Sequence, residues 1–93
     1  MYVVLISFEV LVEGSSSLKM KRGVINRIKD RIRSRFNASV AEIGYLDKWQ
    51  RAAMGVTLIS NEKKKLQKDV DAIQAMLVSF TDMSVNQFTV EWL

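Results

Sequence analysis

Positively charged side chains gather in one short segment of the chain, where they could bind an anion. The chain has 93 residues, of which 14 are lysine or arginine. Arginine suits phosphate because its planar guanidinium donates to two oxygens at once and stays charged. Between residues 19 and 35 the only acid is Asp30, whereas the cations there are Lys19, Lys21, Arg22, Arg27, Lys29, Arg31, Arg33 and Arg35. A surface of this kind predicts an anionic partner.

An amphipathic helix is predicted to carry these cations, with Ser16 or Ser17 as its N-cap. Between Leu18 and Phe36 the apolar residues cover an arc of about 120°, which is typical of a helix packed on a core. We expect the Lys21 stem, which falls inside that arc, to lie along the sheet edge with its ammonium in water. One flank of the arc holds Lys19, Arg22, Lys29 and Arg33, and the other holds Arg27, Arg31 and Arg35.

Three interpretations of this helix remain open. Like charges four residues apart destabilise a helix by roughly 0.2–0.5 kcal/mol per pair, so we expect something to compensate them. A row of phosphates would do so, and this favours nucleic acid. Alternatively, acids elsewhere in the chain reach the helix, or the face is only solvated; those acids are Glu9, Glu13, Asp82 and Glu91. A helix on a membrane surface would need its apolar stripe free for lipid, and the sheet is expected to cover that stripe.

The remaining segments predict an α+β domain. Alternating apolar residues indicate strands at 2–12, 37–45, 49–60 and 81–93, with a turn over 45–48. A second amphipathic helix follows Asn61, its expected N-cap. The order β-α-β-β-α-β is typical of the ferredoxin-like fold, with a four-stranded antiparallel sheet and two helices on one face. We expect residues 1–93 to form this single domain.

Composition narrows the chemistry. The net charge is +4 and the sequence pI about 9.6, which favours a polyanion as partner. The chain has no cysteine and no histidine, so it lacks the commonest nucleophile, general base and zinc ligands. We therefore expect no enzymatic activity, cofactor, metal or small-molecule substrate. The apolar start is too short to span a bilayer, and we expect a cytoplasmic protein without a membrane partner.

Two further groups of residues are of interest. Trp49 and Arg51 are two apart, so we expect them to share a sheet face, where they could contact bases and phosphates; Trp49 could instead plug the hairpin turn. Glu42 is expected to pair with Arg51 across the hairpin.

The second helix begins with a lysine cluster that either enlarges the basic surface or is simply solvated: Lys63, Lys64, Lys65 and Lys68.

Three stretches together resemble a known family: Ser17-Leu18-Lys19-Met20-Lys21-Arg22, then Arg35 to Glu42 (RFNASVAE), then Asp47 to Ala52 (DKWQRA). In order and spacing they are similar to the YlxP-like family of bacterial domains of unknown function. The resemblance implies a ferredoxin-like fold and no established activity. Genes of that family often lie beside translation and ribosome-binding factors, which implies a role around RNA or small-subunit maturation by association only.

The sequence thus favours a small protein that binds RNA or the ribosomal small subunit electrostatically through its first helix. The alternative is a homodimer through the open sheet face, where Val3, Leu5 and Leu11 would leave an apolar patch. The predicted nucleic-acid-binding residues are Lys19, Arg22, Arg27, Lys29, Arg31, Arg33, Arg35, Trp49 and Arg51.

Overall fold

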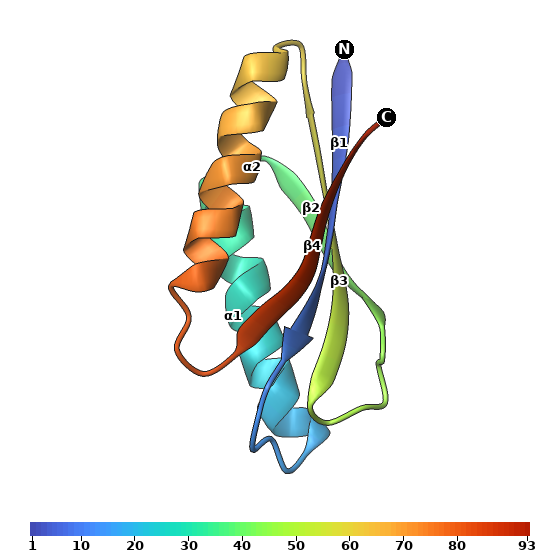
Figure 1. Ribbon diagram of the computed structural model, residues 1–93, viewed down its shortest axis with the longest axis vertical. Helices are drawn as coiled ribbons and strands as arrows, with labels where there is room; N and C mark the ends of the chain where they lie inside the picture. Colours follow the sequence, from blue (N-terminus) through green and yellow to red (C-terminus); the bar gives the residue numbers. More distant parts are fainter.

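Four strands and two helices follow one another in the predicted order. In a computed structural model that describes residues 1–93, the elements are β1 (Tyr2–Leu11), α1 (Leu18–Arg35), β2 (Ala38–Gly44), β3 (Arg51–Ser60), α2 (Lys63–Val78) and β4 (Ser84–Trp92). The strands form one sheet in the order β2-β3-β1-β4, and every neighbouring pair is antiparallel. Both helices lie on the same face of this sheet (Figure 1). The predicted α+β ferredoxin-like fold is confirmed.

The core lies between that sheet face and the helices. Alternate residues of β1 are buried because successive side chains of a strand point to opposite faces. The helices bury the predicted apolar stripes against them. The buried residues of β1 are Val4, Ile6, Phe8 and Val10, those of α1 include Val24, Ile25, Ile28 and Ile32, and those of α2 include Leu66, Val70, Ile73 and Leu77.

Local hydrogen bonds decide where the helices begin. The Ser17 hydroxyl accepts a bond from the Met20 amide at 3.1 Å, so Ser17 caps α1 as one of the two predicted residues. The expected cap of α2 at Asn61 is wrong. Glu62 occupies the cap position without a side-chain bond, and its amide donates instead to the Ser60 hydroxyl at 3.1 Å.

The hairpin between β2 and β3 differs from its predicted limits. A bulge interrupts the β2–β3 register between Glu42 and Gly44. Tyr45 then has a φ of 59°, a left-handed conformation that cannot continue a strand. The strand therefore ends at Gly44, and β3 begins only at Arg51. Trp49, predicted as the first residue of β3, lies in the loop instead.

β4 contains a second irregularity. Its register with β1 shifts between Ser7 and Glu9, and Gln87 opposite this point has a φ of 53°. The bulge places Phe88 against Phe8, with their ring centroids 6.1 Å apart. The two aromatic rings thus pack on the helix side of the sheet, although the alternation along β4 is broken.

Candidate nucleic-acid interface

The cations of α1 fall into two groups with different surroundings. On the side that faces α2, the guanidinium carbons of Arg27 and Arg31 lie 5.9 and 4.5 Å from the centroid of the Phe80 ring. Arg27 also forms an ion pair with Asp82, beyond the end of α2. Asp82 was among the acids that the sequence suggested could reach the helix. This side of α1 is therefore partly neutralised by the protein itself.

The other flank of α1 has no acidic partner. Lys19, Arg22, Lys29 and Arg33 form no ion pair, and they fall within about 80° of the helix circumference over about 21 Å of its length. Arg33 alone has a polar contact, since it donates to the Val40 carbonyl of β2 at 3.2 Å. We call these four side chains the α1 ridge. It is the longest row of uncompensated charge in the molecule.

Arg35 extends the cationic surface to the end of the helix. It is the last residue of α1, it is exposed, and it forms no ion pair. A cation in the last turn is favourable there, because the carbonyl end of a helix carries partial negative charge. Its position has a structural explanation even without a ligand.

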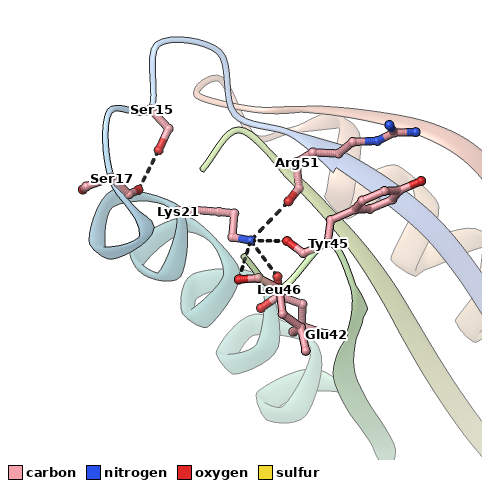
Figure 2. Close-up of polar contacts among 7 residues, drawn as sticks. All are labelled: Ser15, Ser17, Lys21, Glu42, Tyr45, Leu46 and Arg51. Carbon is pink, nitrogen blue, oxygen red and sulfur yellow. Dashed lines mark hydrogen bonds and ion pairs between the residues drawn. The ribbon is translucent and has the colours of Figure 1, made fainter. Parts of the chain in front are cut away.

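Lys21 is buried, which contradicts the expectation that its ammonium lies in water. Its side chain is 1 % exposed, and it points from α1 toward the β2–β3 hairpin (Figure 2). The Nζ atom donates to the carbonyls of Tyr45 at 2.8 Å and Arg51 at 3.2 Å, and the Leu46 carbonyl is 3.5 Å away. A charge removed from water needs such partners. The sequence signal for this burial is the position of Lys21 inside the apolar arc of the helix.

Glu42 provides the balancing charge for Lys21 and does not pair with Arg51. Its Oε2 lies 3.0 Å from Lys21 Nζ and accepts no other bond. Glu42 is opposite Met54, a core residue, and therefore lies on the helix side of the sheet. Arg51 is on the opposite face, so the predicted Glu42–Arg51 pair is impossible. The Arg51 guanidinium bonds both oxygens of Glu9 instead, at 2.9 and 3.1 Å.

The hairpin loop carries the second part of the predicted site. Trp49 is 54 % exposed, so it does not plug the turn. Because Trp49 lies before β3, it does not share a strand face with Arg51. Both residues nevertheless line one hollow of about 310 Å³, together with Tyr45, Lys48 and Gln50. The Arg51 guanidinium carbon lies 4.1 Å from the centroid of the Tyr45 ring.

Hydrogen bonds hold both ends of this loop. At its start, the Lys48 amide donates to the Tyr45 carbonyl at 3.0 Å. At its end, the Gln50 carbonyl accepts from the Val12 amide at 2.9 Å, and Gln50 Nε2 donates to the Ser15 carbonyl at 3.2 Å. Together with the contacts of Lys21, these bonds tie the loop to α1 and to the connection that precedes it.

The lysine cluster of α2 is less concentrated than its sequence suggests. Lys65 pairs with Asp69 at 2.8 Å, and the ammonium of Lys63 lies 5.1 Å from the centroid of a Trp92 ring. Lys64 and Lys68 are exposed and unpaired. α2 therefore has two unpaired cations, whereas the α1 ridge has four.

Comparison with known proteins identifies the family. The family described as "Protein of unknown function (DUF503)" matches residues 3–90. The chain belongs to this family. It is 34 % identical over 84 residues to "Uncharacterized protein YlxP" of Bacillus subtilis (strain 168). The aligned residues cover 90 % of this chain and 91 % of that protein. The resemblance seen in the sequence is confirmed, and neither description names an activity.

Two further features concern metal binding and membrane insertion. No three acidic side chains come together in a group that could hold a metal ion. Neither helix combines the length and the apolar character needed to cross a membrane.

Loss of the Lys21 ammonium should destabilise the fold strongly. In Lys21→Met the carboxylate of Glu42 stays buried without its counter-charge, so we expect the free energy of unfolding to fall by about 3–5 kcal/mol. Urea unfolding followed by circular dichroism measures this. Lys19→Met, two residues earlier in the same helix but exposed, should change stability by less than about 0.5 kcal/mol. Equal effects of the two variants would contradict the structural role of Lys21.

Proposed function

We propose that the protein is a cytoplasmic RNA-binding protein, not an enzyme, and that the α1 ridge binds the phosphate backbone. The observation that supports this is the contrast between the two flanks of α1. Arg27 and Arg31 have partners within the protein, whereas Lys19, Arg22 and Lys29 have none. Cations without a partner in the protein are free to contact the phosphates of a ligand. The ribosomal small subunit is the RNA partner that the family resemblance suggests.

Phosphate binding would relieve a cost within the free protein. Lys29 and Arg33 are four residues apart with like charge, a spacing that destabilises a helix by roughly 0.2–0.5 kcal/mol. The contact of Arg33 with the Val40 carbonyl holds its guanidinium in place while leaving other N–H groups free to donate. Each phosphate that is engaged would also release counterions, which is the main driving force of nonspecific nucleic-acid binding.

Removal of two ridge charges should weaken RNA binding and reduce its dependence on salt. For Arg22→Glu/Lys29→Glu we expect the slope of log affinity against log salt to fall in magnitude by about 1.4, since each phosphate contact to single-stranded RNA contributes about 0.7. Fluorescence anisotropy with labelled RNA over a salt series measures this slope.

The matched control changes the same charge on the other helix. Lys64→Glu/Lys68→Glu lowers the net charge by the same amount, at two exposed positions that, like Arg22 and the half-buried Lys29, form no ion pair. If RNA bound the protein through overall charge, both variants would lose affinity equally, and the proposed site on α1 would be refuted. A loss confined to the ridge variant supports it.

Self-association through the open sheet face is the second candidate function. No element covers this face (Figure 1). Ile59, which is opposite Val3 in the register, is 53 % exposed, and Ile43 is 61 % exposed. Exposed apolar side chains on an uncovered sheet commonly mark a subunit interface. A dimer of this kind would leave the α1 ridge on the outside, so the two functions are compatible.

A charge on the open face should prevent such a dimer. We expect sedimentation equilibrium to show that Ile59→Glu dissociates a dimer that the wild type forms at high protein concentration. Val78→Glu, at an exposed position on α2, serves as the control and should leave association unchanged. A wild type that stays monomeric over the whole concentration range would refute this candidate.

A further inference from the structure

We propose that the loop between β2 and β3 is a stacking subsite for one unpaired base of RNA, with Trp49 as the stacking ring. This inference rests on the proposed function and specifies it, because it makes single-stranded RNA the ligand. The α1 ridge would hold the backbone, and the loop would hold a base. The basis of the proposal is an exposed aromatic ring on a loop that the rest of the fold keeps rigid.

Trp49 forms no aromatic or cation–π contact within the protein. More than half of its surface is exposed, no aromatic ring stacks on it, and no cation lies over it. Indole is the largest apolar side chain, and leaving it in water forgoes the stabilisation that burial would give. The other tryptophan, Trp92, packs partly against the core and lies beneath Lys63. Of the two tryptophans, Trp49 is therefore the one whose ring is available to a ligand.

The conformation of the loop is fixed before any ligand arrives. Lys21 Nζ binds the carbonyls of Tyr45 and Arg51 on either side of the loop. Gln50, the neighbour of Trp49, is bonded through both its backbone and its side chain to the segment before α1. Tyr45 has one ring face against the Arg51 guanidinium. The backbone on both sides of Trp49 therefore loses little conformational freedom when a ligand binds, which favours affinity.

The loop lies next to the start of the α1 ridge. Lys21 contacts the loop directly (Figure 2), and Lys19 and Arg22 are close to it in the sequence of the first turns of α1. A strand whose phosphates follow the ridge toward the N-terminus of α1 would pass around the hairpin to reach the hollow, because Arg51 of the hollow lies on the sheet face opposite the helices. Lys48, which lines the hollow beside Trp49, is placed to meet the next phosphate.

The chemistry of the hollow suits an unpaired base. Its volume is about 310 Å³, and its lining combines two aromatic rings with Lys48, which forms no ion pair, and with Arg51, whose guanidinium is already paired with Glu9. Aromatic side chains stack on any base and need no sequence readout. In a duplex the faces of the bases are already stacked on each other, so only a single strand can offer one. Asp47 is in the same loop but does not line the hollow.

The test compares two single strands that differ only in having bases. Decauridylate and an abasic ribose-phosphate strand of the same length are titrated into wild type, Trp49→Ala and Trp49→Phe at one salt concentration. We expect Trp49→Ala to bind decauridylate about 5- to 150-fold more weakly, the range for loss of one stacked base. Trp49→Phe, which keeps a ring, should retain most of the affinity. The abasic strand should not distinguish the three proteins.

Fluorescence provides an independent readout. In a Trp92→Phe background the emission comes from Trp49 alone, and decauridylate should quench it while the abasic strand should not. Quenching that depends on protein concentration without RNA would mean that a second copy covers the indole, which would overturn the subsite.

The remaining outcomes separate the subsite from the proposed function. If Trp49→Ala binds both strands as the wild type does, while Arg22→Glu/Lys29→Glu binds both weakly, the subsite is refuted and phosphate binding by α1 stands. If the wild type binds neither strand even at low salt, RNA binding itself is refuted, and the subsite with it.

Discussion

The buried ammonium of Lys21 is the interaction on which the rest of this arrangement depends. The Lys21 side chain extends from the buried side of α1, and its ammonium donates hydrogen bonds to backbone carbonyls at both ends of the β2–β3 loop. Glu42 is its counter-charge. Transfer of an ion pair from water costs several kcal/mol per ion, and three backbone carbonyls near one nitrogen help to offset that cost. A methionine at this position would pack as well but could not hold the loop. The lysine therefore determines where the loop lies relative to the helix.

This anchor connects two features that are far apart in the sequence. The helix presents a row of cations without acidic partners, and the loop presents a tryptophan without an aromatic or cationic partner. Since Lys21 belongs to the helix and bonds to the loop, it ties the N-terminal part of α1 to the segment that carries Trp49 (Figure 2). On the opposite flank, which faces α2, Arg27 pairs with Asp82 and Arg31 lies over the Phe80 ring. The fold thus concentrates uncompensated charge on one side of α1.

The sequence predicts the elements well because periodicity depends on burial. The alternation in β1 and the stripe from Leu66 to Leu77 in α2 each identify the face that meets the core, and the order of elements then leaves few topologies. The same pattern predicts that the cations of α1 other than Lys21 lie outside its apolar stripe and that one face of the sheet is uncovered. What periodicity cannot show is which side chains meet across the sheet, because that depends on register.

The wrong predictions come from constraints that a local pattern does not show. Glu42 and Arg51 are close in the hairpin sequence, but a bulge and the turn at Tyr45 place them on opposite faces. Lys21 was expected in water because the carbonyls that surround it come from a loop more than twenty residues away. Asn61 has the composition of an N-cap, but the chain turns at Ser60 and begins the helix one residue later. Each error comes from a local pattern that a distant or geometric constraint overrides.

Titration of isotope-labelled protein with decauridylate at low salt, followed by amide resonances in NMR spectra, tests most directly which surface meets RNA. Binding along the α1 ridge and at the loop should shift the amides of residues 19–33 and 45–50 and leave those of α2 and the open sheet face in place. Shifts confined to α2 or to the open face, or no shifts at all, would contradict the assignment of the cationic surface of α1 as the RNA-binding site.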